Sequence, residues 1–207
     1  MGLYLGFMYE ASNRLAVVNR ACTEDTGFPI PVMRELCYLQ FRFVCELIAL
    51  CCLVAHGNTD KRLMQTYQAD KIMNQMERLK PTFYPYPTKI TKENGKLRFT
   101  PQKLPLYLTK KHLIKLWGIT GDKTHRSPLS KAMRSDIRDP EGFADILEWG
   151  EKFAALLPVH QITLDPLRVM VVTLFGERTG QPEARILKYS PETNMASVQV
   201  FWRKRIQ

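Results

Sequence analysis

The polar segment at residues 118–127 (GITGDKTHRS) brings three reactive side chains within five residues of one another: Asp122, His125 and Arg126. An imidazole can transfer protons while a neighbouring guanidinium holds phosphate, so histidine beside arginine is suited to contacting and cleaving a phosphodiester. We therefore take these three as candidate catalytic residues. In the alternative interpretation, His125 is structural and caps a helix or bonds a neighbouring carbonyl group.

The sequence contains no motif typical of other catalytic classes. A phosphate-binding P-loop needs Gly-Lys-Ser/Thr after a strand, whereas Asp122 separates Gly121 from Lys123 and a helix is expected before them. The four histidines are scattered without metal-ligand spacing, and no G-x-S-x-G nucleophile motif occurs. We therefore expect neither a bound metal nor a cofactor.

A further candidate lies in the apolar stretch 33–55. Glu35, Arg42 and Glu46 fall near one helical face, because seven and four residues are about two turns and one turn. Arg42 and Glu46 are therefore expected to form an ion pair in partly apolar surroundings. Three roles stay open: a structural pair that orients helices, a Glu46 carboxylate with a raised pKa that acts as an acid or base, and a salt bridge to a second subunit.

The positive charge of the chain is concentrated in residues 59–135. This block holds seventeen Lys and Arg against five Asp and Glu, a net charge of +12, while the segments on either side each carry −1. Such a block suits nucleic acid, a phosphorylated ligand or an acidic protein. Its first part, residues 80–108, interleaves cations with aromatic residues, as single-stranded nucleic acid binding requires. The candidate nucleic-acid-binding residues are Lys89, Lys92, Lys96, Arg98, Lys110, Lys111, Lys115 and Lys123.

Two other interpretations of the basic block remain. The cations could form an ordinary solvated surface, with the aromatic residues Phe83, Tyr84, Tyr86, Phe99 and Tyr107 pinning the segment to the rest of the protein. The block could also hold an acidic protein partner.

The apolar spacing predicts about five helices. We expect them at residues 3–21, 31–56, 59–79 and 109–121 and from Pro140 to Pro158. The fourth is expected to stop at Gly118 or Gly121. Pro31 and Pro140 would each open a helix, since proline is tolerated in a first turn.

Between the third and fourth helices, five prolines over residues 81–108 exclude a helix. The turn signal at residues 93–96 (ENGK) predicts a β-hairpin or an extended arm. The last fifty residues predict a three-stranded antiparallel meander. We therefore expect an α+β fold: a helical bundle over 1–158 with a basic arm at 81–108, and a small β meander over 159–207 packed on the bundle.

Composition indicates a globular protein: the chain has 207 residues, of which 45% are hydrophobic. Five cysteines, four of them in one apolar helix, argue against a disulfide framework and for a reducing compartment. The N-terminus has no basic leader. The longest uninterrupted apolar part of the second helix, residues 47–55, is much shorter than the about 20 residues that span a membrane. We expect a cytoplasmic protein with no membrane segment.

Two segments carry a family resemblance: residues 45–50 (CELIAL) with 54–57 (VAHG), and residues 121–126 (GDKTHR). Together they resemble uncharacterised bacterial proteins with a HEPN-like helical bundle, a superfamily that contains ribonucleases of toxin and phage-defence systems and also members that only bind. In the catalytic members, an arginine lies four to six residues before a histidine, and two subunits complete the site. His125 would match that histidine. The matching arginine is absent, because Thr120 stands five residues earlier, although Arg126 could act from the other side.

The resemblance and the basic block together predict an RNA-binding protein of HEPN-like type, working as a homodimer, either without cleavage or as a weak or degenerate ribonuclease. The main alternative is a non-enzymatic interaction module that uses the arm or a sheet edge to dimerise or to hold a partner. A third is a small-molecule enzyme that uses Glu46 and His125.

Overall fold

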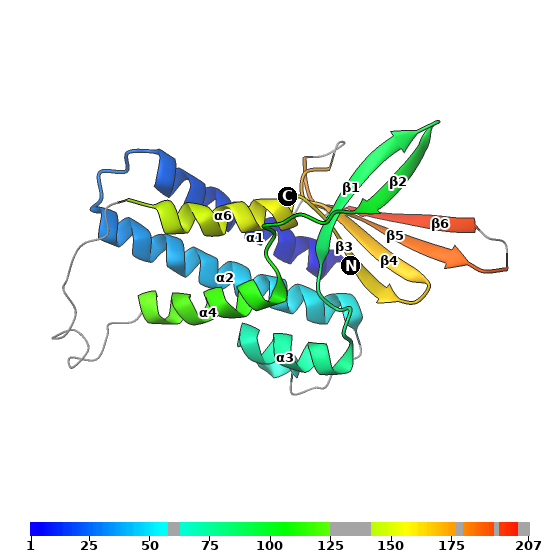
Figure 1. The fold of residues 1–207 in the computed structure, drawn as a ribbon, viewed down its shortest axis with the longest axis horizontal. Coiled ribbons are helices and arrows are strands. Elements are labelled where there is room, and N and C mark those ends of the chain that lie inside the picture. Colours follow the sequence, from blue (N-terminus) through cyan, green and yellow to red (C-terminus); the bar gives the residue numbers. More distant parts are fainter. Residues whose placement is uncertain (58–62, 125–141, 177–179, 193–194, 203–207) are drawn as a thin grey trace.

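A computed structural model describes residues 1–57, 63–124, 142–176, 180–192 and 195–202. Within these ranges the protein has five α-helices and one antiparallel sheet of six strands, which confirms the predicted α+β class. The helices occupy one end of the molecule and the sheet the other (Figure 1). The helices are α1 (Gly2–Thr23), α2 (Ile30–His56), α3 (Ala69–Leu79), α4 (Lys110–Thr124) and α6 (Ala144–Leu156), and the strands are β1 (Tyr86–Glu93), β2 (Lys96–Pro101), β3 (Val159–Asp165), β4 (Arg168–Thr173), β5 (Glu183–Ser190) and β6 (Met195–Trp202).

Helix α2 is the central element of the bundle, and α1, α3, α4 and α6 all contact it. Its cysteines Cys37, Cys45, Cys51 and Cys52 are buried in the core, where free thiols behave as small hydrophobes. Among the described helices, only α2 is long and apolar enough to cross a membrane. Core helices can have the same length and composition, and 61% of the most apolar stretch of α2 is buried against the rest of the protein.

Two helix boundaries differ from the predicted ones at their starts. Helix α3 begins at Ala69 rather than near residue 59, because Leu63–Gln65 forms a separate 3-10 helix and the backbone is extended at Gln68. Helix α6 begins at Ala144, and the predicted helix start at Pro140 lies outside the described residues.

Helix α4 continues through both predicted stops to Thr124. A glycine inside a helix costs about 1 kcal/mol relative to alanine, and burial of the apolar side of a helix can offset that cost. Leu113, Leu116 and Trp117 bury this side of α4. The place where a Cβ of Gly121 would stand is 3.6 Å from Nη1 of Arg42, so α4 lies close to α2 at that glycine.

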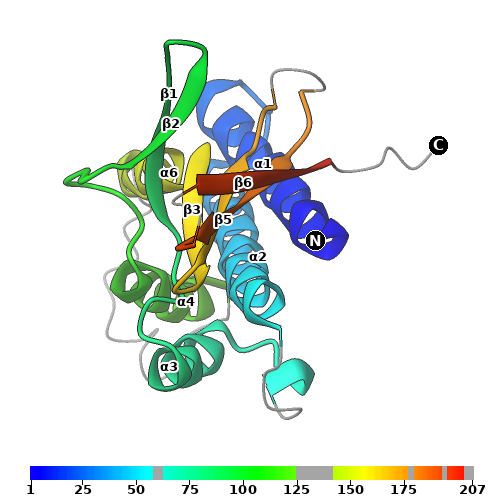
Figure 2. The same cartoon turned by 90° about the vertical axis from the view of Figure 1, so that its right-hand side faces the viewer.

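Strands β1 and β2 form the predicted hairpin, with pairs from Thr88↔Pro101 to Glu93↔Lys96. The turn residues Asn94 and Gly95 have φ angles of 50° and 77°, the left-handed backbone that a two-residue type I′ turn requires. The tip of the hairpin projects away from the helices (Figure 1, Figure 2).

The predicted three-stranded meander is wrong: the sheet has six strands in the order β2-β1-β3-β4-β5-β6. Tyr86 and Pro87 of the hairpin pair with Gln161 and His160 of β3, so the basic arm is part of the sheet. Strand β3 was missed because a histidine stands at one of its core positions and hides the apolar alternation. The expected domain boundary at residue 158 therefore has strands of one sheet on both sides.

The sheet packs on the helices through Ile162, Met170, Val172 and Ala184. His160 lies on the same side of the sheet and is fully buried. Its Nδ1–H donates to the Leu157 carbonyl oxygen at 2.9 Å, so its Nε2 accepts from the Tyr4 hydroxyl at 2.8 Å. Burial lowers the pKa of His160 to about 4. A neutral imidazole thus links the start of α1 to the sheet.

Candidate nucleic-acid interface

Of the four candidate catalytic residues, only Asp122 and Glu46 lie in the described part of the chain. His125 and Arg126 lie outside the described residues. Asp122 is exposed on the last turn of α4, while Glu46 lies half-buried on α2. No hydrogen bond or ion pair joins Asp122 to Glu46 in the described structure.

The predicted Arg42–Glu46 ion pair is confirmed, with Nε of Arg42 3.7 Å from Oε1 of Glu46. The guanidinium of Arg42 also lies over the Trp117 ring of α4, with Cζ 3.8 Å from the ring centroid. Burial raises the pKa of Glu46, and the positive charges of Arg42 and Arg14 oppose that shift. The contact of Arg42 with Trp117 helps to hold α2 against α4. Glu46 binds a proton more readily than a fully solvated glutamate does.

A polar cluster that the sequence analysis missed joins α2 to α6. Arg34 is 8% exposed and donates to both carboxylate oxygens of Asp145, at 2.7 and 2.6 Å, and to the Gly142 carbonyl oxygen at 2.5 Å. The Tyr38 hydroxyl donates to Asp145 at 2.5 Å. These bonds lower the pKa of Asp145 to about 2. Because Arg34 and Tyr38 both donate hydrogen bonds to the Asp145 carboxylate, we assign the cluster a structural role in fixing the start of α6.

Arg34 and Tyr38 stand one helical turn apart in an apolar helix, which is a sequence signal for a buried polar contact. Their partner could not be identified in the same way, because Asp145 lies more than a hundred residues further along the chain.

Seven of the eight predicted nucleic-acid-binding side chains are exposed, and the eighth, Lys110, is half-buried. Lys110 forms an ion pair with Glu77, and Arg98 pairs with Glu93 at 3.3 Å. Among described residues, the other six have no carboxylate within ion-pair distance. The hairpin and α4, which carry all eight, both lie toward the left of Figure 2, whereas in Figure 1 the hairpin points away from the bundle that contains α4.

Several aromatic residues of the basic block anchor the hairpin, as one of the alternative interpretations predicts. Phe83 is 1% exposed, the Tyr84 hydroxyl donates to the Leu108 carbonyl oxygen at 3.0 Å, and the Tyr86 hydroxyl accepts from the side-chain amide of Gln161. These contacts bind the base of the hairpin to the body of the protein.

Tyr84 and Tyr86, together with Tyr107, also line a surface cleft of about 550 Å³ between the base of the hairpin and the start of α4. Tyr86 and Tyr107 are both half-buried, so part of each side chain remains open to solvent. The cleft combines these aromatic rings with two lysines, and it is lined by Tyr84, Pro85, Tyr86, Pro101, Gln102, Lys103, Leu104, Tyr107 and Lys110.

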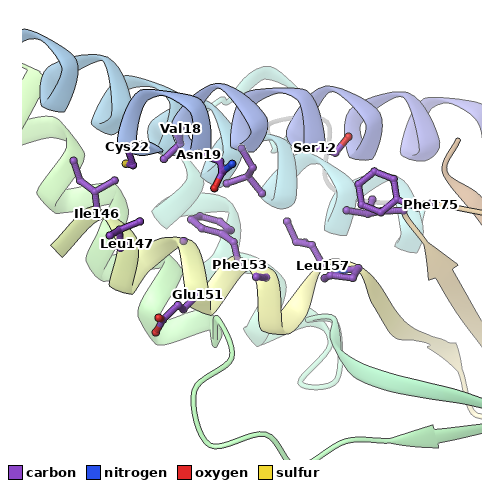
Figure 3. A pocket seen from close by; sticks show the side chains of 15 residues that line it. Ser12, Val18, Asn19, Cys22, Ile146, Leu147, Glu151, Phe153, Leu157 and Phe175 are labelled. Carbon is purple, nitrogen blue, oxygen red and sulfur yellow. The ribbon is translucent and has the colours of Figure 1, made fainter. Parts of the chain in front are cut away.

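An apolar groove of about 470 Å³ between α1 and α6 was not anticipated from the sequence (Figure 3). Cys22 lies toward one end, with a thiol pKa raised by burial, and Phe175, which is 66% exposed, lies at the other. Among the described residues that line the groove there is no Lys, Arg or His. Sequence patterns could not show it, because it depends on the spacing of two helices far apart in the chain.

No group of three or more His, Cys, Asp or Glu side chains suited to a metal ion occurs in the described part of the protein. In comparisons with known proteins, no family model, no curated protein and no solved structure matches this chain. The charged and aromatic surface of the hairpin and α4 is the candidate functional site.

Proposed function

We propose that the chain is an RNA-binding protein of HEPN-like type and that RNA lies along the hairpin β1–β2, residues 102–110 and α4. We call the cations of this surface the basic band: Lys89, Lys92, Lys96, Arg98, Lys103, Lys110, Lys111, Lys115 and Lys123. The observation that carries the proposal is that seven of these nine side chains are exposed and form no ion pair among the described residues.

Charge alone would favour any polyanion, and the cleft at the base of the hairpin narrows the choice. Unstacked bases can lie against tyrosine rings while lysines contact the phosphates on either side. In the cleft, Tyr86 and Tyr107 lie beside Lys103 and Lys110. A duplex keeps its bases stacked inside, so this combination favours a single strand. The choice of RNA over DNA rests on the HEPN-like resemblance.

Reversing two charges of the band should weaken RNA binding. In the variant Lys89→Glu/Lys96→Glu, both substituted side chains are exposed and lie on the same side of the hairpin by strand alternation. We expect the dissociation constant for a labelled single-stranded RNA to rise about tenfold or more in fluorescence anisotropy at low salt. The salt dependence should also fall, by about 0.7 in logarithmic slope for each phosphate that the variant no longer neutralises.

A control comes from two inner strands of the sheet. Arg168, which pairs with Asp165, and Lys188 are exposed and directly opposite each other on β4 and β5, outside the basic band. The variant Arg168→Glu/Lys188→Glu makes the same change in net charge, and we expect it to alter affinity less than about threefold. If both variants lost the same affinity for RNA, the binding would depend only on total charge. That result would contradict the proposal that RNA binds at the basic band.

The tyrosine part of the site has a different signature. Tyr107→Ala should weaken single-stranded RNA binding by about 1 kcal/mol or more, the usual loss for a stacked base, while leaving the salt slope unchanged. A slope that fell together with affinity would assign Tyr107 to the charged contacts. Unchanged affinity, with the variant still folded by circular dichroism, would remove the cleft from the site.

A further inference from the structure

The sheet has two outer strands, β2 and β6, and they differ in how their free edges are protected. Natural proteins guard exposed edges against pairing with other chains by placing lysine, other charges or proline on them. Strand β2 follows this rule, because Lys96, Arg98 and Pro101 all lie on it. The exposed cations and the proline make β2 a poor template for another strand.

Strand β6 has none of these guards. Its sequence, MASVQVFW, contains no charged residue and no proline over eight positions. It pairs with β5 along its whole length, from Ser190↔Met195 to Glu183↔Trp202, and with no other described strand. Val198 is 52% exposed and Trp202 is 46% exposed. An uncharged, fully extended edge with exposed apolar side chains is a template for a further strand.

We propose that β6 pairs antiparallel with β6 of a second copy of this chain, so that two six-stranded sheets join into one. The inner side of the strand is already fixed, because Phe201 packs against the core of its own subunit. The outer backbone edge and the side chains of Val198 and Trp202 supply the contact. The second copy covers the edge of β6 with which no described strand pairs.

A second copy fits this edge because the strand is complementary to itself about a two-fold axis. Side chains alternate between the two faces of a strand. If the outer faces of both copies form one face of the joined sheet, an antiparallel pair places Val198 opposite Val198, Val200 or Trp202 of the other copy. Each of these pairs is apolar, and no like charges meet within the strand. An antiparallel arrangement also keeps apart the two carboxyl ends, which lead into Arg203, Lys204 and Arg205.

One strand from each copy makes a small interface, at the lower limit of stable association. We therefore expect a micromolar rather than a nanomolar dissociation constant. The measurement must follow molar mass over a concentration series.

The test compares full-length chains by sedimentation equilibrium from about 1 to 200 µM. We expect the unmodified protein to move from its monomer mass of 24.0 kDa toward twice that value. Val198→Lys should raise the dissociation constant at least tenfold, because in each of these registers it places a cation opposite an apolar side chain or a second cation. Leu97→Lys is the matched control: Leu97 is 49% exposed on the guarded edge strand β2, and its substitution should leave the dissociation constant unchanged.

Hydrogen exchange supplies a second readout that does not depend on a variant. The amides of β6 should become more protected as concentration rises, while those of β2 should not. A monomer at every concentration would overturn the proposal, and so would a dimer that Val198→Lys does not weaken although the variant melts like the unmodified protein. Both outcomes are independent of RNA binding, because β6 carries no residue of the basic band.

Discussion

Replacing Asp145 with alanine is expected to lower the free energy of unfolding by about 2 kcal/mol, the cost of leaving a nearly buried charged donor without its acceptor. The cost comes from Arg34, whose side chain is 9% exposed, rather than from Asp145, whose side chain is 45% exposed. Without the carboxylate, the guanidinium stays buried and retains only the Gly142 carbonyl oxygen among its hydrogen-bond acceptors in the described structure. Urea unfolding followed by circular dichroism measures the change.

The end of α1 offers a control. Glu24 pairs with Arg20 at 3.0 Å, and both side chains are exposed, at 52% and 72%, so Glu24→Ala strands no buried charge and should lower the free energy of unfolding far less than Asp145→Ala. The double variant Arg34→Met/Asp145→Ala should recover part of the loss, because it removes the stranded charge and fills the space with an apolar side chain. If Asp145→Ala and Glu24→Ala cost the same, the cluster of Arg34, Tyr38 and Asp145 does not hold α6 as the structure indicates.

The helices and the hairpin could be predicted because their signals are local. Apolar spacing within a few turns located α1 and α2 within one or two residues of their observed ends. The dipeptide Asn94-Gly95 specified the hairpin turn, since both residues tolerate the left-handed backbone found there. The helix stop predicted at Gly118 or Gly121 was wrong, because packing against α2 outweighs the local preference of glycine to end a helix.

The extent of the sheet could not be predicted, because it depends on pairing between distant segments. Tyr86 and Gln161 are neighbours on β1 and β3 although 75 residues separate them. The alternation in β3 was hidden by His160, a polar residue at a core position whose partner is Tyr4 at the other end of the chain. A single sequence does not reveal which polar residue will find a buried partner.

The candidate interface was predicted in its composition but not in its detail. Counting charges located the cations of the hairpin and α4. That these side chains would be exposed follows from their charge. The count could not show that Glu77 and Glu93 engage Lys110 and Arg98, because these pairs depend on side-chain packing. It also could not show that Tyr84 and Tyr86 both anchor the hairpin and line the cleft.

Acid should destabilise the protein through His160. Burial lowers the folded-state pKa of this residue to about 4, whereas an unfolded histidine titrates near 6.5. Between these two values the unfolded chain binds a proton that the folded protein excludes, so stability is complete above about pH 6.5 and falls as the pH drops toward 4. The shift corresponds to about 3 kcal/mol of unfolding free energy lost across that range. Urea unfolding at a series of pH values measures it.

Substitution separates His160 from the other titrating groups. His160→Gln should be less stable at neutral pH but should lose the slope between pH 6.5 and 4. Tyr4→Phe should cost about 1 kcal/mol, the value of one hydrogen bond, and keep the slope, because burial is the largest cause of the pKa shift. Asp145 titrates in a lower range, since its pKa is lowered to about 2. A slope that survived in His160→Gln would have to come from another group, such as the half-buried His56, whose pKa is also lowered by burial.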